Sequence, residues 1–351
     1  MTVGSKEDGH LAVPLTAMCS SGGCAAKYGG APLRTLLSGL GRSHPNLIVG
    51  IEGADDAAVY KLDESSGIVA SVDFFPPVVD DPFAYGKISA NNALNDIYAM
   101  GGTPAFALSI AAFPEELPLQ SAAEILAGAA EQCEAAGAIL AGGHTVRSAE
   151  PKFGLAVTGF VGLGRIWRKA GAQVGDSLYL SKPLGTGIVL SGHRQGRASQ
   201  EKLDTAITWM TIPGKAIAAA IAGVQPHAVT DVTGFGLLGH ADEIAMASGV
   251  ELVIESGSLQ TMDGAVQLAR EGVRTSNDER NRELLAGRLR VEESVDAVLL
   301  ALALDPQTAG GLLVSLAPSE AEKLSRETRK NGVDIARIGY VEAGSGVRLV
   351  A

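Results

Sequence analysis

The feature that most constrains the fold is an alternation of strand-like and helix-like segments that runs from Pro32 to the C-terminus. Short runs rich in apolar residues predict strands at 46–52, 57–62, 67–73, 104–113, 138–141, 153–164, 177–181, 228–231, 251–254 and 311–316, with further strands up to residue 351. Apolar residues at helical spacing predict helices at 82–100, 119–136, within 200–223, from about residue 234, and at 318–331. This order of elements indicates two α+β domains of similar size.

The segment 168–176 is the best candidate for a domain boundary, because it is polar, carries glycines and lies between two apolar strands. A length of 351 residues is itself typical of about two domains. Residues 1–30 are rich in Gly and Ser without a sustained apolar period, which is typical of a mobile segment. We therefore expect a flexible N-terminal segment over 1–30, an N-terminal domain over 31–168 and a C-terminal domain over 169–351.

The composition excludes several classes of protein. With 46% hydrophobic and 19% charged residues the chain has enough apolar material for a core, so it is neither disordered nor fibrous. A net charge of -11 repels phosphate backbones and argues against a nucleic-acid partner. The longest apolar stretches, 216–223 and 297–304, are too short to span a membrane. The N-terminus lacks a secretory signal, and three cysteines are too few for a disulfide framework, so we expect a soluble, cytoplasmic protein.

Aspartates recur beside the predicted strands. They are Asp55 and Asp56 before the strand at 57–62, Asp73 at the end of the strand at 67–73, and Asp231 at the end of the strand at 228–231. Asp96 follows Asn92 by four residues, so the two share one face of the helix at 82–100. A single aspartate at a strand end commonly only begins a turn. Several together suggest oxygen ligands for Mg²⁺ that bridges nucleotide phosphates.

A second candidate site is the cysteine and lysine of the glycine-rich N-terminal segment. Cys24 stands three residues before Lys27. A thiol near an ammonium group on a flexible segment can have a lowered pKa and act as a nucleophile. The alternatives are a buried cysteine beside a solvated lysine, or a redox pair of Cys24 with Cys19, although their spacing is not that of a thioredoxin-type motif.

Glycine pairs at 141–145 and 307–311 would let backbone amides approach phosphate, although such pairs are commonly turns. The sequence contains no Walker-type phosphate loop, so any ATP site must be built differently. Gly234, Gly236 and Gly239 match the dinucleotide fingerprint in outline. Asp231 and Thr233 stand where that fingerprint has a small apolar residue, so a nicotinamide-dependent oxidoreductase is a minor alternative.

These segments together resemble selenophosphate synthetase, a family of the aminoimidazole ribonucleotide synthetase-like superfamily. The resemblance runs from about Leu15 to the C-terminus and is carried by motifs at 23–27, 55–60, 71–75, 92–102, 140–144, 153–159, 230–240 and 305–311. It implies synthesis of selenophosphate from selenide, ATP and water with release of AMP and orthophosphate, which supplies selenium for selenocysteine and selenouridine. It also implies a homodimer formed by the N-terminal domain with the nucleotide at the interface. A selenium-delivery protein is a further possible partner that the sequence does not identify.

The resemblance implies a role for each matching residue. Cys24 and Lys27 would be catalytic, and the expected ATP contacts are Lys27, Gly53, Ala54, Asp55, Asp73, Asn92, Asp96, Gly143, His144 and Thr145. Asp56, Asp96 and Asp231 would bind Mg²⁺, with more than one ion when ATP is bound. The chain departs from many members at Ala26 and Ser20, where these carry a second Cys and a His. A non-catalytic ATP- or selenium-binding protein on the same scaffold is the remaining alternative.

Overall fold

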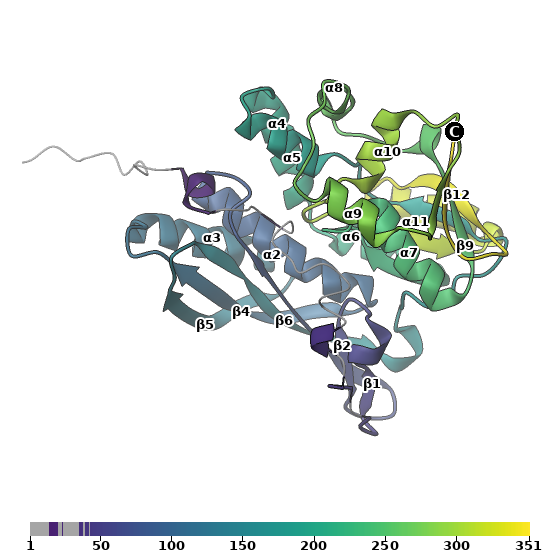
Figure 1. The fold of residues 1–351 in the computed structure, drawn as a ribbon. Helices are drawn as coiled ribbons and strands as arrows, with labels where there is room; N and C mark the ends of the chain where they lie inside the picture. The colour runs from purple at the N-terminus through teal and green to yellow at the C-terminus, as the bar shows by residue number, and fades with distance from the viewer. Residues whose placement is uncertain (1–13, 20–22, 24–34, 38, 42) are drawn as a thin grey trace, which may run out of the picture.

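The computed structural model describes residues 14–19, 23, 35–37, 39–41 and 43–351. Figure 1 shows two sheets, the first built from the N-terminal half of the chain and the second from the C-terminal half, each with its own helices. The predicted α+β class, with mixed sheets flanked by helices, is confirmed. The domain limits at 31–168 and 169–351 stay predictions, and most of the expected N-terminal segment 1–30 lies outside the described residues.

The first sheet has the strand order β1-β2-β3-β6-β4-β5. Its strands are β1 (Leu47–Val49), β2 (Ala58–Lys61), β3 (Ser66–Phe75), β4 (Thr103–Phe113), β5 (Ile139–Arg147) and β6 (Lys152–Gly162). Neighbouring strands are antiparallel except β4 and β5, which run parallel. Helices α2 (Pro82–Ala99) and α3 (Leu119–Ala136) pack on one face of this sheet (Figure 1).

The second sheet has the strand order β10-β13-β9-β12-β7-β11-β8. Its strands are β7 (Ser177–Leu180), β8 (Pro226–Asp231), β9 (Glu251–Glu255), β10 (Leu289–Val291), β11 (Leu312–Leu316), β12 (Ala336–Glu342) and β13 (Gly346–Val350). The helices of this half are α4 (Thr186–Arg194), α5 (Gln200–Thr211), α6 (Lys215–Ala222), α7 (Gly236–Ser248), α8 (Ala265–Arg270), α9 (Asp278–Leu284), α10 (Ala297–Leu304) and α11 (Ala321–Asn331). Short 3-10 turns occur at Leu15–Met18, Ile51–Gly53, Leu163–Arg165, Ser256–Ser258 and Pro318–Glu320.

The central strands of the second sheet are buried on both faces, because alternate side chains of a strand point to opposite sides. On β11, Leu313 joins the core under α7, whereas Leu312 and Val314 join the core under α6 and α11. A strand covered on both faces reads as a continuous apolar run, and Leu312–Leu316 has that character. In the part of the chain that the structure describes, no single helix meets the length and hydropathy expected of a membrane span; α5 and α6 do so only as a pair bent by 46°.

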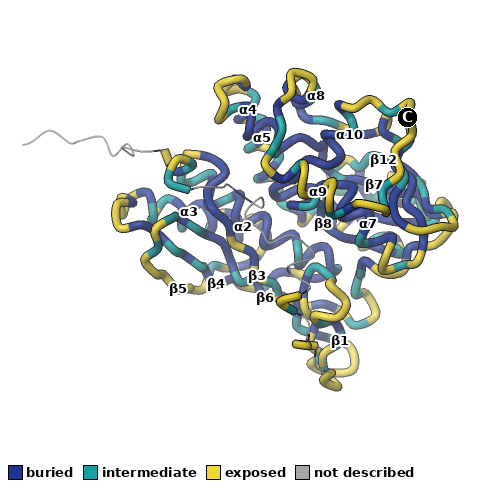
Figure 2. The backbone as a smooth tube through the Cα atoms, viewed as in Figure 1, coloured by how far each residue is buried: buried dark blue, intermediate teal, exposed yellow. Residues whose placement is uncertain are grey.

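Helix α2 lies between the first sheet and the second half of the chain, where it contacts α5, α6 and β8. Its start is defined by the sequence, since the Asp81 carboxylate accepts the N–H of Ala84 and Pro82 occupies the first turn. α2 and α3 approach closely at Gly86 and Gly128, where a methyl group would overlap a backbone carbonyl of the other helix. Figure 2 shows α2 buried along most of its length, so the polar residues that it carries are held in place.

The opposite face of the first sheet is exposed and apolar. Side chains that point away from α2 and α3 include Val72, Phe74, Phe106, Leu108 and Phe160, with exposed fractions from 38% to 57%. Their alternation with buried neighbours follows the two-residue period of a strand. The first sheet therefore has one face that nothing in the described chain covers.

Three details differ from the sequence-based expectations. The expected strand at 46–52 is shorter, because the chain turns at Ile51–Gly53 and Ala54 adopts a positive φ of 47°. Asp73 lies inside β3 and not after it. The glycine pair at 142–143 is part of β5 and not a turn; a side chain at Gly143 would overlap Ser109 of β4, so only glycine fits there.

The pattern at 234–239 opens α7 after β8, as the dinucleotide fingerprint would. However, β8 has β11 as its neighbour in the sheet and the pair is antiparallel, while β9 lies between β13 and β12. The fingerprint requires a parallel β-α-β unit. The glycines therefore do not form a nicotinamide site of that kind.

Candidate active site

Several of the predicted site residues lie where the two halves of the chain touch. Asp56 lies just before β2, and its Oδ1 accepts hydrogen bonds from the Thr230 hydroxyl of β8 at 2.9 Å and from the Lys169 ammonium at 3.0 Å. Its Oδ2 is buried and has no hydrogen-bond partner among the described residues. One carboxylate oxygen is thus held by residues 169 and 230, while the other has no donor in the part of the chain that the structure describes.

The residues directly before Asp56 are held by the same lysine. The backbone N–H of Lys169 donates to Asp55 Oδ1 at 2.8 Å, and its ammonium donates to the Ala54 carbonyl at 3.0 Å. Burial raises the pKa of the Asp55 carboxyl, while the backbone N–H of Lys169 lowers it, and burial prevails. Gly53 ends the 3-10 turn that leads into this segment.

Helix α2 joins β3 to a loop of the second half through two asparagines. Asn92 donates from Nδ2 to Asp73 Oδ2 at 2.5 Å and accepts the N–H of Ala309 on Oδ1 at 2.7 Å. Asn95, one turn along, donates to the Gly310 carbonyl at 3.2 Å. The glycine pair at 310–311 therefore lies against α2, close to Asn92 and Asp73.

Asp96 and Asp231 lie on either side of the same junction. The Ser71 hydroxyl donates to Asp96 Oδ2 at 2.5 Å and lies 3.4 Å from the Asp56 carbonyl, so β3 ties these two aspartates together. Asp231 is the last residue of β8 and is 2% exposed. Burial lowers the pKa of the nearby Lys182 to about 7, with Asp231 acting in the opposite direction.

Gly143, His144 and Thr145 do not join this cluster within one chain. They lie on β5, which is the edge strand of the first sheet and is exposed. Three strand spacings separate β5 from β3, which is about 14 Å at roughly 4.8 Å per spacing. These residues could approach Asp73 and Asp96 only from the β5 strand of a second copy of the chain.

Cys24 and Lys27 lie outside the described residues. The residue before Cys24 is described: Gly23 donates its N–H to the Pro76 carbonyl at 3.0 Å and lies against Val78 and Thr308. The chain therefore passes the junction of the two halves immediately before Cys24. Burial raises the pKa of the Cys133 thiol to about 11, which makes this cysteine of α3 unreactive.

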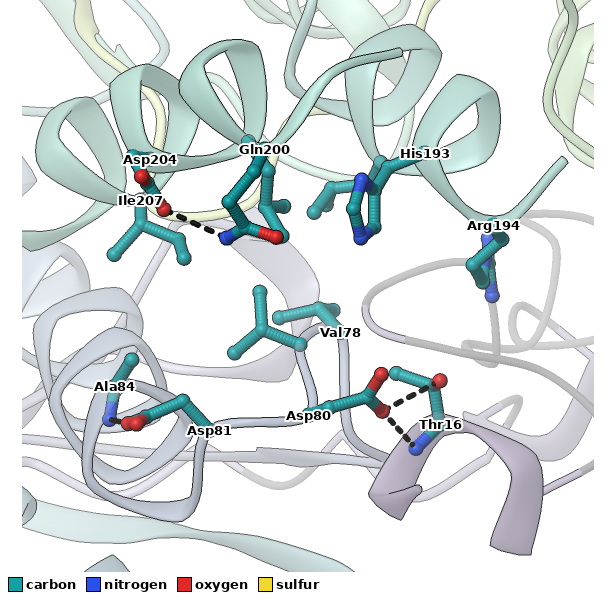
Figure 3. A pocket seen from close by; sticks show the side chains of 13 residues that line it. Thr16, Val78, Asp80, Asp81, Ala84, His193, Arg194, Gln200, Asp204 and Ile207 are labelled. Carbon is teal, nitrogen blue, oxygen red and sulfur yellow. Dashed lines mark hydrogen bonds between the residues drawn. The ribbon is translucent and has the colours of Figure 1, made fainter. Parts of the chain in front are cut away.

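A separate pocket of about 280 Å³ lies between the loop before α2 and helices α4 and α5 (Figure 3). Asp80 at its floor accepts both the N–H and the hydroxyl of Thr16, and Gln200 of α5 bonds Asp204 in its roof. None of the predicted ligands lines this pocket. It is therefore distinct from the cluster around Asp56.

Comparison with known proteins assigns the chain to a family. The family model of the AIR synthase related protein N-terminal domain matches residues 54–161, and that of the C-terminal domain matches 173–351. The selenide, water dikinase of Geobacter metallireducens is 43% identical over 94% of this chain and 96% of its own length. That of Clostridioides difficile is 39% identical over 92% of this chain and 94% of its own. The chain belongs to the selenide, water dikinase family.

Solved structures show the same fold outside this family. A thiamine-monophosphate kinase of Stenotrophomonas maltophilia has a TM-score of 0.65 at 22% identity, covering 91% of this chain and 93% of that one. The hydrogenase maturation protein HypE of E. coli has a TM-score of 0.63 at 22% identity, covering 92% and 94%. These similarities concern the fold alone. The predicted resemblance to the dikinase family is confirmed by the closer sequence relatives.

The arrangement of this dikinase-family site fits Mg²⁺ that arrives with a nucleotide. Among the described residues no three His, Cys, Asp or Glu side chains gather closely enough to hold a metal ion by themselves. Mg²⁺ is commonly bound by one or two carboxylates together with substrate phosphates, and not in an all-protein cage. The buried Oδ2 of Asp56 is an oxygen donor suited to that role. The individual roles of Asp56, Asp96 and Asp231 stay predictions.

Sequence reasoning missed the residues that support the aspartates. Lys169, Ser71 and Thr230 each bond a predicted ligand or its neighbour, yet none was singled out. Two of them carried a usable signal, because Ser71 and Thr230 lie in the motifs that hold Asp73 and Asp231. Lys169 lies in the polar segment at 168–176, which the sequence indicates only as a candidate domain boundary.

Proposed function

We propose that the protein makes selenophosphate from selenide, ATP and water, and that it releases AMP and orthophosphate. The observation that carries this proposal is that Asp56 bonds Thr230 across the junction of the two halves, and that Asn92 bonds both Asp73 and the loop at Ala309 at the same junction. Relatives that match over 92–94% of this chain are named selenide, water dikinase, a kinase-type enzyme, so the whole chain and not one domain supports the activity.

The chain supplies binding and orientation for phosphoryl transfer. Asn92 holds Asp73 and the loop at Ala309 in fixed positions beside the nucleotide, and Asp55 lies next to Asp56 at the turn. Mg²⁺ bound through Asp56, Asp96 and Asp231 would neutralise the triphosphate against the approaching selenide anion. Phosphoryl transfer needs little covalent chemistry from a protein, so a rigid set of ligands is what such an enzyme must provide.

Cys24 and Lys27 complete the proposal. The position of Gly23, against Val78 and Thr308, supports a place for the following residues beside the junction. Lys27 would contact phosphate, and the thiol of Cys24 would serve selenium chemistry. A glycine-rich segment that closes over the nucleotide would exclude water while the phosphoryl group is transferred.

The proposed assembly is a homodimer through the exposed face of the first sheet. An apolar face carrying Val72, Phe74, Phe106, Leu108 and Phe160 is typical of a surface that a partner covers. In such a dimer, β5 of one copy would bring Gly143, His144 and Thr145 to the nucleotide site of the other copy. Within a single chain these three residues lie too far from Asp73 and Asp96.

The proposed location of the protein is the cytoplasm. The thiols of Cys19 and Cys133 are both free, as is usual in a reducing compartment. Separation of cell fractions followed by detection of the native protein would test this location.

The product of the reaction tests the function. ³¹P NMR and chromatography of ATP incubated with Mg²⁺ and selenide should show AMP, orthophosphate and selenophosphate in equal amounts. Stoichiometric ADP without AMP would mean transfer of a single phosphoryl group and would refute the dikinase proposal. Binding of ATP without selenide-dependent turnover would identify a non-catalytic member of the fold.

A further inference from the structure

Lys169 is a buried lysine at the junction of the two halves. It belongs to the polar segment between the two halves and is 6% exposed. Its ammonium lies 2.8 Å from Glu243 Oε2, 3.0 Å from Asp56 Oδ1 and 3.0 Å from the Ala54 carbonyl. An ammonium group has three N–H donors, so these acceptors satisfy it completely. No bulk water is needed to complete its coordination.

The lysine is fixed from the second half of the chain at both ends. Its backbone carbonyl accepts the Ser248 hydroxyl at 3.3 Å, and the same Ser248 oxygen accepts the N–H groups of Gly171 and Ala172 at 3.0 Å. Its side chain is held by Glu243, one turn and a half earlier on α7. Lys169 thus connects α7, through Glu243 and Ser248, to the 54–56 segment of the first half.

The charged groups around Lys169 form one network. The ammonium makes salt bridges with Glu243 at 2.8 Å and with Asp56 at 3.0 Å, and the side chains of Lys169 and Asp56 are both buried. His240 lies 3.1 Å from Glu243 and 3.3 Å from the Thr233 hydroxyl, which extends the network along α7.

The contact with Lys169 fixes the orientation of the Asp56 carboxylate. Two donors, Thr230 and Lys169, occupy Oδ1, so the carboxylate cannot rotate without losing both. The other oxygen, Oδ2, is buried and has no donor in the described chain. A buried anionic oxygen left without a donor is costly unless a cation or water meets it.

We propose that Lys169 is a positioning residue for the metal–nucleotide site: by holding Oδ1 of Asp56 and the carbonyl of Ala54 against α7, it presents Oδ2 of Asp56 to Mg²⁺. This inference rests on the proposed function, since it concerns the same Mg²⁺ and nucleotide. Lys169 itself touches neither. A purely structural role, as a link between the two halves, predicts loss of stability without a change in metal dependence.

The test is the Mg²⁺ dependence of nucleotide binding in Lys169→Met and Lys169→Arg. Calorimetry with the β,γ-methylene analogue of ATP, in which the transferred phosphoryl group cannot leave, is run on the full chain at a series of Mg²⁺ concentrations without selenide. Loss of a residue that orients a metal ligand typically weakens metal affinity by about tenfold or more. Lys169→Met should raise the Mg²⁺ concentration for half-maximal binding by about that factor, and Lys169→Arg should recover part of it.

The matched control is Arg288→Met. Arg288 also anchors α7 through a buried carboxylate, with its Nε 2.9 Å from Asp242 Oδ2, but it does not touch the 54–56 segment. This variant should lose thermal stability and keep the wild-type Mg²⁺ dependence. An equal shift of Mg²⁺ dependence in Arg288→Met, or none in a folded Lys169→Met, would overturn the proposal.

If Lys169→Met does not fold, Glu243→Gln decides. The neutral amide weakens the hold on Lys169 without touching Asp56, so a smaller shift in the same direction is expected, and an unchanged Mg²⁺ dependence overturns the proposal. The readout is independent of product formation. A wild-type protein that binds the analogue with Mg²⁺ but makes no selenophosphate contradicts the proposed function and leaves the role of Lys169 to be judged on binding.

Discussion

Asp305 is a buried carboxyl group at the end of α10 that caps the N-terminus of α4. It is 2% exposed, and its Oδ2 accepts the N–H of Ile188 at 3.1 Å and the Gln307 amide at 3.1 Å. Its Oδ1 is buried without a hydrogen-bond partner in the described chain. Burial raises the pKa of this carboxyl to about 8, against about 3.9 for a free aspartate.

The sign of the effect on stability follows from where the proton is held. Between these two pKa values the folded chain keeps a proton that the unfolded chain has released, so stability falls as the pH rises through that window. At pH 7 the separation from 3.9 is about three units, or about 4 kcal/mol at 1.36 kcal/mol per unit. The pKa of about 8 already includes the hydrogen bond from the backbone N–H of Ile188 at the N-terminus of α4, which favours the charged form.

Asp305→Asn removes this penalty, because the amide oxygen still accepts both hydrogen bonds and the side chain cannot ionise. The variant should be more stable than the wild type by about 4 kcal/mol at pH 7, with a smaller difference at pH 5. Urea unfolding of both proteins at pH 5, 6, 7 and 8 measures the difference. Asp296→Asn, which alters the exposed N-cap of α10, controls for the exchange of a capping residue. A variant less stable than the wild type by the same amount at every pH would show that Asp305 is ionised and stabilises α4 as a charged cap.

Three other outcomes are expected. Gly128→Ala should destabilise the protein by about 1–3 kcal/mol in thermal unfolding, despite the better helix propensity of alanine, because its methyl group would overlap α2. The control is Gly164→Ala, since a methyl group there would meet nothing within 4 Å. Equal stabilities of the two variants would contradict the close contact between α2 and α3. Cys24→Ser should abolish selenide-dependent AMP formation while Mg²⁺-ATP binding persists; full turnover would remove the thiol from the mechanism. Asp96→Asn and Asp231→Asn should each weaken Mg²⁺-dependent nucleotide binding in calorimetry, since an amide is a poorer ligand for a hard cation; wild-type affinity in both folded variants would refute the metal assignment.

The sequence predicted best the elements whose ends carry local signals. Helix α2 was expected over 82–100 and is observed over Pro82–Ala99, with Asp81 and Pro82 marking its start. Helix α3 was expected and observed to end at Ala136, where Gly137 adopts a left-handed conformation. Helices α4, α8, α9 and α10 were not expected, because each is short; the N-terminus of α4 is in addition capped by the distant Asp305.

The site was predicted only in part, because its supporting contacts, like the cap of α4, come from residues far away in the sequence. Aspartates beside strands could be found from local pattern, but their supports lie far away along the chain: Thr230 is 174 residues from Asp56, and Lys169 is 114 residues from Asp55. Local sequence patterns give no pairing at such distances. Asp73 was placed at a strand end, whereas it lies inside β3 on the face that α2 covers, where Asn92 meets it.

The contacts that join the two halves also build the proposed site. Asn92 and Asn95 bond the loop at 309–310, and Asp56 bonds Thr230 across the same junction. A shift of one half against the other would therefore move the predicted ligands relative to one another. Because α2 is packed against α3 and the first sheet on one side and the second half on the other, such a shift is resisted by the core and not only by the polar contacts. The predicted ligands are consequently held in place by the fold itself, and such a rigid arrangement favours electrostatic stabilisation of a transferred phosphoryl group without reorganisation of the protein.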